Sequence, residues 1–278
     1  MHTLNCAICY SNAHQLLHSL NDGELVTCQN CGVVAFTPRP TPEELEAFYN
    51  NGYHDRFSES AMANMHFAQN RYQFLENMLH RYAPKLAVQT GRKLLDVGCG
   101  TGDFLQVAQQ AGWHVTGTEL AKDAVDRASQ KVGNHILQGD MTEIYVPDGS
   151  YHLVTSYHVI EHLLDPIAQL KRCYDLLIPG GLLFVETPNI QSLGARLKGK
   201  NWSHIIPPEH ILYFSPVSLR HALHRAGFDQ IVVGTSAPQI VESIVHWPWA
   251  LKKLAGFIYQ IAPRVGLGAA VQALAFKQ

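Results

Sequence analysis

The sequence predicts an α/β fold, in which a parallel sheet with helices on both faces follows a small cysteine-rich module. Two observations predict it. From residue 91 onward, short apolar runs typical of strands alternate with amphipathic stretches typical of helices, and this alternation builds parallel sheets with right-handed crossovers. Near the start, four cysteines form two closely spaced pairs. The 278 residues suffice for one full-sized core and a small additional module.

The composition is that of an ordinary globular protein, with 46% hydrophobic and 16% charged residues. A formal net charge of -2 gives no overall electrostatic attraction to RNA or DNA, so no nucleic-acid partner is expected. The N-terminus lacks the basic and apolar regions of a secretory signal, and no uncharged run is long enough to span a bilayer. We therefore expect a cytoplasmic location.

The cysteine pairs predict a structural zinc ion in a ribbon over residues 1–37. The pairs have the spacing CxxC and are separated by eighteen residues, an interval typical of zinc ribbons. Four thiolates complete a tetrahedron and leave no position for a substrate. Gly32 follows the last cysteine and permits a positive φ, and residues 21–23 predict a turn between two short strands. Chance clustering of reduced cysteines is the alternative. The predicted ligands are Cys6, Cys9, Cys28 and Cys31.

Residues 38–90 are predicted to form a helical linker. Three prolines around residue 40 exclude a central strand, and Thr41 can cap a helix that begins at Pro42. A second helix is expected from about residue 60 to 82, because apolar residues recur there on one stripe. That stripe consists of Met65, Tyr72, Leu75 and Leu79.

The first strand of the predicted sheet ends in the glycine-rich stretch "LLDVGCGTGDF". Its glycines have the spacing GxGxG, which differs from the GxGxxG fingerprint of dinucleotide-binding proteins. Glycines at this point let the backbone pass close to a ligand. Asp96 and Asp103 flank the loop and would repel a phosphate group. Cys99, inside the loop, is expected to be a small filler.

Acidic residues also end the next two predicted strands. Glu119 is placed to hydrogen-bond a ribose, and Asp140 is placed to accept from an exocyclic amine while Met141 packs on adenine. The alternatives are a solvated turn for Glu119 and a helix cap for Asp140. Carboxylates at three successive strand ends favour a ligand that combines ribose, adenine and a positive charge.

These motifs, with "GTEL", "QGDM", "YHVIEHLLDP" and "LLIPGGLLFVETPN", resemble those of class I S-adenosylmethionine-dependent methyltransferases over about residues 91–235. The resemblance implies a Rossmann-like sheet, S-adenosylmethionine as cofactor, and a position for His158 near the sulfonium. By the same resemblance, the cofactor-binding residues are Asp96, Gly98, Gly100, Gly102, Glu119, Leu120, Asp140, Met141 and His158.

His158, Glu161 and His162 have the spacing HxxEH, which on a helix is the zinc motif of the inverted metalloproteases. Here the motif follows a sheet strand, and Pro166 excludes a long helix through it. A peptidase is therefore not expected. Glu161 and His162 are predicted to face the acceptor; the alternative is that Glu161 caps a helix and His162 fills a pocket.

A second candidate pair follows two prolines in "IIPPEHILYFSPVSLRHALHRAGF". This pattern behind a zinc module resembles methyltransferases acting on nucleotide-linked deoxysugars, in which the corresponding histidine is the base. We expect His210 to be the base, with His162 as the second candidate and Glu161 and Glu209 orienting them. Ser215 is predicted to cap the following helix.

The expected function is methyl transfer to a hydroxyl or acidic carbon of a small molecule, including nucleotide-linked or lipid-linked sugars. An RNA methyltransferase and a non-catalytic ribbon adaptor are the alternatives.

Residues 236–278 form an apolar, basic tail, in which Trp247 and Trp249 precede Lys252 and Lys253. This pattern favours a helix lying in a membrane interface, or else a stripe that packs on the sheet or on a second subunit. The oligomeric state stays open.

Overall fold

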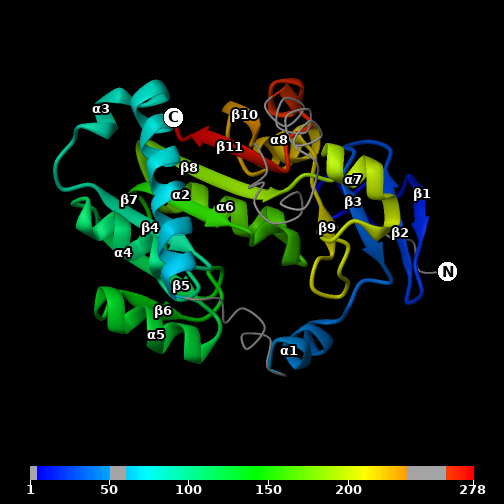
Figure 1. Ribbon diagram of the computed structural model, residues 1–278, viewed down its shortest axis with the longest axis horizontal. Coiled ribbons are helices and arrows are strands. Elements are labelled where there is room, and N and C mark those ends of the chain that lie inside the picture. The colour runs from blue at the N-terminus through cyan, green and yellow to red at the C-terminus, as the bar shows by residue number, and fades with distance from the viewer. Residues whose placement is uncertain (1–4, 51–60, 237–260) are drawn as a thin grey trace, which may run out of the picture. The chain divides into compact units, whose positions relative to one another are not determined.

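A computed structural model describes residues 5–50, 61–236 and 261–278 of the chain (Figure 1). The chain forms two compact units, each built from separate stretches of sequence. Unit 1 comprises residues 1–42, 158–167 and 185–275; unit 2 comprises residues 43–157, 168–184 and 276–278. The sequence predicts domains that are each one continuous segment, whereas each of these units combines three separate segments of the chain.

Unit 2 contains the predicted parallel sheet, so the fold class is confirmed (Figure 1). Strand β4 pairs in parallel with β5 and β7, and β5 pairs in parallel with β6. The strand order is β8-β7-β4-β5-β6, with β8 contributing residues up to 184. The strands are β4 (Lys93–Val97), β5 (His114–Glu119), β6 (Ile136–Gln138), β7 (Tyr151–Tyr157) and β8 (Leu177–Pro188).

The helices of unit 2 follow from the apolar stripes of the sequence. Helices α4 (Asp103–Gln110) and α5 (Lys122–Val132) contact β5, and α2 (Ala61–Tyr82) contacts α4 and α3 (Pro84–Ala87). Leu75 and Leu79 of α2 are fully buried, as the predicted stripe requires. Strands β4 and β7 are buried along nearly their whole length, which is typical of parallel strands covered on both faces.

Unit 1 contains the ribbon. Strands β1 (His14–Ser19), β2 (Glu24–Cys28) and β3 (Val34–Thr37) form an antiparallel sheet, which confirms the short strands and the turn predicted between the cysteine pairs. A fourth strand, β9 (Leu212–Tyr213), pairs with β3. Trp202 packs with Leu25 and Phe36 of the ribbon strands. The ribbon sheet is therefore completed by a segment that directly follows His210 and Ile211.

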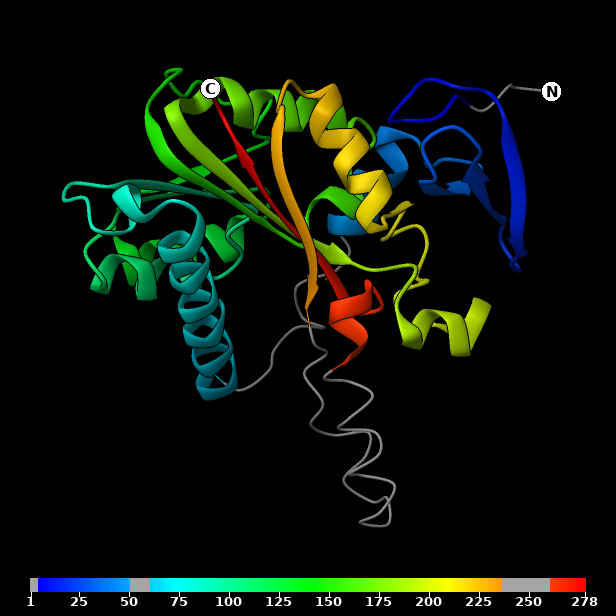
Figure 2. The ribbon, with the colours of Figure 1, turned by 90° about the horizontal axis from the view of Figure 1, so that it is seen from above.

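The remainder of unit 1 consists of two strands and several short helices. Strand β10 (Gln230–Ser236) lies beside β11 (Ala270–Phe276), which pairs with β8, and α8 (Pro216–Arg225) contacts β10 (Figure 2). Ser215 forms a capping box with Ser218 at the start of α8, so the predicted cap is confirmed. The other helices of unit 1 are η2 (Ile160–His162), α7 (Leu193–Lys198), η3 (Gly199–Asn201) and η4 (Ala262–Val265); α1 (Pro42–Asn50) and α6 (Pro166–Leu176) belong almost entirely to unit 2.

The last part of the predicted tail is a buried strand. Residues 270–276 form strand β11 within the sheet, which agrees with the alternative that the tail packs on the sheet. A short apolar run cannot be assigned to helix or strand by periodicity alone, which is why the sequence did not predict this strand. Residues 243–260 of the predicted interfacial helix lie outside the described residues. None of the described helices is long and apolar enough to cross a membrane.

Candidate functional site

The four ribbon cysteines lie close enough together to hold one metal ion. Their sulfur atoms are all within 4.8 Å of one another, and none of the cysteines forms a disulfide. The Sγ atoms of Cys6 and Cys31 are 3.5 Å apart, as are those of Cys9 and Cys28. Zinc–sulfur bonds of about 2.3 Å in a tetrahedron place sulfurs about 3.8 Å apart. The geometry therefore fits the predicted zinc ion.

Each cysteine pair is followed by a residue in the left-handed region. Gly32 has the predicted positive φ, +74°, and its N–H donates to the carbonyl of Cys28 at 2.9 Å. Tyr10 takes the matching position after the first pair, with φ +60° and its N–H 3.0 Å from the carbonyl of Cys6. The glycine at position 32 indicates its turn in the sequence. A tyrosine carries no such signal, so the turn at Tyr10 was not predicted.

The glycine loop between β4 and α4 adopts the conformation that its sequence indicates. Gly98, Gly100 and Gly102 have φ values of +68°, +54° and +77°. A Cβ atom on Gly102 would lie 2.9 Å from Cβ of Ala128, so this glycine also permits close packing against α5. Among the described residues, no atom lies within 4 Å of a Cβ built on Gly100, which leaves space beside this glycine.

Asp96 is a buried carboxyl group at the end of β4. It accepts a hydrogen bond of 2.7 Å from Thr155 Oγ1. Burial raises the pKa of Asp96 to about 7, against the opposing effects of this hydrogen bond and of Arg71. A positively charged ligand would favour the ionised form of such a group.

Glu119 joins the end of β5 to the glycine loop. One of its carboxylate oxygens accepts from the N–H of Gly100 at 2.9 Å, and the other accepts from Leu120 and Ala121 at 2.8 and 3.0 Å. The Leu120 side chain is 60% exposed beside it. The carboxylate is thus fixed in orientation, and Oε2, which accepts only from Gly100, keeps a second lone pair for a ligand.

Asp140 and Met141 follow β6. Asp140 accepts from the N–H of Thr142 at 2.7 Å, a local turn cap close to the alternative considered from the sequence. Met141 is only 2% exposed, so its side chain belongs to the core of unit 2. The roles of these residues toward a cofactor stay predictions.

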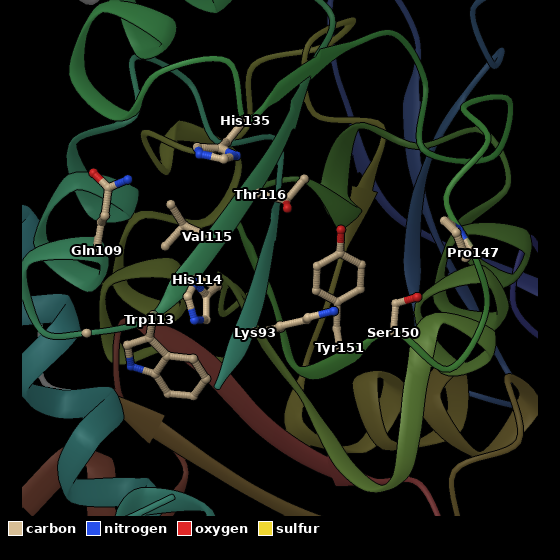
Figure 3. Close-up of a pocket in the computed structure, with 11 residues that line it drawn as sticks. Lys93, Gln109, Trp113, His114, Val115, Thr116, His135, Pro147, Ser150 and Tyr151 are labelled. Atoms are coloured by element: carbon tan, nitrogen blue, oxygen red, sulfur yellow. The ribbon is translucent and has the colours of Figure 1, made fainter. Parts of the chain in front are cut away.

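A pocket of about 590 Å³ opens elsewhere on the sheet of unit 2 (Figure 3). Lys93, His114 and Tyr151 line it, and they are the first residues of β4, β5 and β7. The pocket therefore lies at the amino ends of the parallel strands, whereas Asp96 and Glu119 lie toward their carboxyl ends. No residue predicted to bind the cofactor lines it.

In unit 1, His158 is held between two carboxyl groups. Its Nδ1 lies 3.2 Å from Glu161 Oε1 and its Nε2 lies 3.5 Å from Glu186 Oε1, with the backbone at a positive φ of +56°. Burial lowers the pKa of His158, but these carboxylates outweigh it and raise the pKa to about 9. Glu186 was not singled out from the sequence, although it lies in "FVETPN", where an acidic residue interrupts an apolar strand.

Glu161 is buried within the short helix η2. Its Oε2 accepts a hydrogen bond of 2.9 Å from Thr187 Oγ1, and its Oε1 faces His158. Burial alone would raise the pKa of Glu161, yet the hydrogen bond and charge of His158 bring it down to about 2. Glu161 is thus an ionised group inside the protein, held by specific partners.

His162 and His210 lie against each other. Their ring centroids are 4.8 Å apart, with an interplanar angle of 79°. Nδ1 of His162 lies 2.8 Å from the carbonyl oxygen of Glu209, and Nδ1 of His210 lies 2.9 Å from that of His204. Because a carbonyl can only accept, both Nδ1 atoms carry the hydrogen, and Nε2 carries the lone pair in each neutral ring. Burial lowers the pKa of His210 to about 4.

The structure brings together several residues predicted from distant parts of the sequence. Glu161, His162 and His210 offer ligand or acceptor atoms within 4.8 Å of one another. Glu209 orients His162 through its backbone carbonyl. His204 was missed; its carbonyl orients His210 and its ring stacks on that of His210 at 6.0 Å. Nothing in the local sequence distinguishes His204 from the other histidines.

Comparison with known proteins gives a match to a family model. The model, described as a methyltransferase domain, matches residues 67–232. Malonyl-[acyl-carrier protein] O-methyltransferase of Serratia marcescens is 32% identical over 129 residues, 46% of this chain and 50% of the relative. A ubiquinone biosynthesis O-methyltransferase of Xanthomonas campestris pv. campestris is 30% identical over 160 residues, 54% of this chain and 66% of the relative.

A solved structure shows the same fold. The crystal structure of a SAM dependent methyltransferase from Archaeoglobus fulgidus matches with a TM-score of 0.53 at 22% identity, covering 74% of this chain and 94% of that one. The chain spans only about half to two thirds of the length of the two curated relatives. The ribbon cysteines lie outside the range that the family model matches.

Proposed function

The chain belongs to the methyltransferase-domain family, whose model matches more than half of it, and we propose that it transfers a methyl group from S-adenosylmethionine to a small-molecule acceptor. The acceptor atom is a hydroxyl oxygen or an acidic carbon. Both curated relatives described above are named O-methyltransferases, which favours oxygen.

The cofactor half of the reaction is assigned to unit 2. S-adenosylmethionine supplies a methyl group on a positively charged sulfur, which leaves as a neutral thioether. Asp96 favours that positive charge, the glycine loop lets the backbone approach the ligand, and Glu119 orients the ribose. The exposed side chain of Leu120 packs on the adenine, and Asp140 accepts from its amine. The fixed carboxylate of Glu119 and the open space beside Gly100 support this assignment.

The acceptor half is assigned to the histidines of unit 1, and their geometry is the observation that carries the proposal. Two backbone carbonyls hold His162 and His210 in the tautomer whose Nε2 accepts a proton. His210 is the proposed base: its neutral ring takes the proton of the acceptor hydroxyl, and the buried carboxylate of Glu161 stabilises the imidazolium that forms. His162 is the second candidate.

The acceptor class rests on the chemistry and on resemblance. A hydroxyl group requires a base of this kind, and the "PPEH" stretch resembles that of enzymes acting on nucleotide-linked sugars. We therefore place nucleotide-linked and lipid-linked sugars first among the acceptors. Contact with a membrane surface through residues 243–260 would suit a lipid-linked acceptor.

The test supplies methyl-labelled S-adenosylmethionine with fractionated small-molecule, lipid and RNA extracts. Label is expected in the small-molecule or lipid fraction. His210→Gln should lower the rate by about 10²- to 10⁴-fold. The matched control is His221→Gln, because His221 is an exposed histidine on α8 of the same unit.

Two outcomes would contradict the proposal. Label confined to RNA would identify a nucleic-acid methyltransferase, which the near-neutral net charge disfavours. Binding of the cofactor with no labelled product in any fraction would identify a non-catalytic adaptor.

A further inference from the structure

Three side chains that the proposed function treats as an acid–base group also have the composition of a metal site. Glu161, His162 and His210 each place one ligand atom within 4.8 Å of the other two. All three belong to unit 1. They come from η2 and from the loop before β9, and the backbone N–H of Ile211 donates to the carbonyl of Glu161 at 3.0 Å, which ties these two segments together.

The imidazole rings are held as they are in metal sites. A histidine that binds a metal through one nitrogen normally donates its other N–H to a carbonyl or carboxylate, which fixes the tautomer and the ring orientation. Both rings do so here, at 2.8 Å to the carbonyl of Glu209 and 2.9 Å to that of His204. In this tautomer the nitrogen of each ring that carries a lone pair is Nε2.

The carboxylate is also preoriented. Thr187 Oγ1 donates to one oxygen of Glu161 and Nδ1 of His158 lies near the other, so the group is fixed while each oxygen keeps a lone pair. Two Nε2 atoms and a carboxylate are all acceptors. A divalent cation can accept a lone pair from each of these three groups.

The distances allow a cation after a small adjustment. Bonds of about 2.1 Å in a tetrahedral site place ligand atoms about 3.4 Å apart, so each separation would shorten by at most about 1.4 Å.

We propose that Glu161, His162 and His210 bind one divalent metal ion of the zinc type. Two imidazoles and one carboxylate favour such an ion over magnesium or calcium, which take oxygen ligands. Three protein ligands leave a coordination position open, unlike the four-thiolate ribbon site. These three ligands differ from those of an HxxEH zinc site, in which His158 and His162 would be the two imidazole ligands. Here His158 contacts the carboxylates of Glu161 and Glu186, and His210 is the second imidazole ligand instead.

This inference rests on the proposed function for its consequence. A divalent ion at this position lowers the pKa of a hydroxyl group that binds to it. With the ion bound, His162 and His210 act as its ligands and a hydroxyl acceptor releases its proton to solvent; in the ion-free protein, His210 takes that proton as the base.

The experiment titrates untagged, full-length protein, with zinc already in the ribbon, with Co²⁺ as a probe for zinc-type ions. Calorimetry gives the stoichiometry, and visible absorption reports the ligands. One Co²⁺ per chain is expected in addition to the ribbon ion, without the thiolate-to-cobalt charge-transfer band that exchange into the ribbon would produce. His162→Gln and His210→Gln should each weaken this binding by more than about 10-fold.

Two further variants complete the design. His221→Gln should leave Co²⁺ binding unchanged, since that histidine is exposed on α8. Glu161→Gln should abolish the binding; because Glu161 is buried, its folding is checked by circular dichroism, and the two histidine variants keep the test decisive if it does not fold.

The outcomes separate the metal site from the methyl transfer. Wild-type protein that takes up no ion beyond that of the ribbon, or histidine variants that bind Co²⁺ as wild type does, would overturn the metal site even if an acceptor is methylated. A second ion lost in the histidine variants, with no acceptor labelled in any fraction, would leave the metal site standing and overturn the proposed function.

Discussion

At the scale of single residues, the charge of Asp96 should control cofactor affinity. Burial raises the pKa of Asp96 to about 7, above its ordinary value. Between the ordinary pKa and pH 7, the folded chain therefore holds a proton that the unfolded chain has lost. The contribution of Asp96 to folding stability therefore falls as pH rises toward 7. A sulfonium ligand favours the carboxylate, so affinity for S-adenosylmethionine should increase between about pH 6 and pH 8.

The variant Asp96→Asn should remove this increase and weaken binding by about 1.5 to 3 kcal/mol, the usual value of a hydrogen bond to a charged group. Calorimetry across the pH range measures both effects. Asp126→Asn is the control, because Asp126 is an exposed carboxylate on α5 that pairs with Lys122. Unchanged affinity and pH dependence in Asp96→Asn would show that the cofactor site lies elsewhere.

Two glycines of the loop allow the backbone strain of a positive φ to be separated from the steric overlap of an added Cβ. Gly100→Ala and Gly102→Ala both force alanine into the left-handed region, at a cost of about 1 to 2 kcal/mol. Gly102→Ala should lose about 1 to 3 kcal/mol more, because its Cβ would overlap Ala128, whereas that of Gly100 meets no atom of the described residues. Urea denaturation measures both; equal losses would contradict the predicted packing of the loop on α5.

Sequence identified individual candidates better than it identified their partners. Asp96, Glu119, Glu161 and His210 were all singled out from local motifs. Glu186, His204 and Thr187 were missed, because their contacts to His158, His210 and Glu161 join residues that are 6 to 28 positions apart. Motif spacing carries no information about such contacts.

At the scale of secondary-structure elements, a zinc ion held by the four ribbon cysteines is predicted to support the segment that carries His210. Structural four-thiolate sites contribute roughly 10 to 16 kcal/mol in small zinc modules. Cys28→Ser should therefore lose one zinc per chain and disorder β1, β2 and β3. Because β3 pairs with β9, methyl transfer should fall, while S-adenosylmethionine affinity, assigned to unit 2, should stay.

Elemental analysis and calorimetry test this prediction together. Cys173→Ala is the control, since Cys173 is a buried cysteine of α6 and should leave the zinc content unchanged. Full zinc retention in Cys28→Ser would contradict the ribbon assignment. Loss of zinc with normal methyl transfer would instead show that β9 holds its position without the ion.

At the scale of the whole molecule, the basic segment around Lys252 should decide whether the protein contacts membranes. Removing the chain after residue 241 would also remove β11, a buried strand, so charge reversal is the better test. Wild type should sediment with anionic vesicles at low salt, and Lys252→Glu with Lys253→Glu should not.

The control variant, Lys122→Glu with Lys171→Glu, reverses the charge of two exposed lysines and so changes the net charge by the same amount. These lysines pair with Asp126 and Asp175. This variant should sediment as wild type does. If wild type does not sediment with anionic vesicles, the membrane hypothesis is wrong. If both double variants lose sedimentation equally, net charge rather than this segment is responsible.

The sequence alone determined what depends on neighbouring residues: the cysteine spacing, the glycine loop, the cap at Ser215 and the alternation of strands and helices. These features follow from turn geometry, hydrogen bonding and hydrophobic periodicity among residues that are close in the sequence. Only the tertiary structure showed that β9 completes the ribbon sheet, that β11 is a buried strand, and that Glu161 and His162 meet His210. Such pairings depend on burial and on backbone contacts between distant segments, which no local pattern encodes.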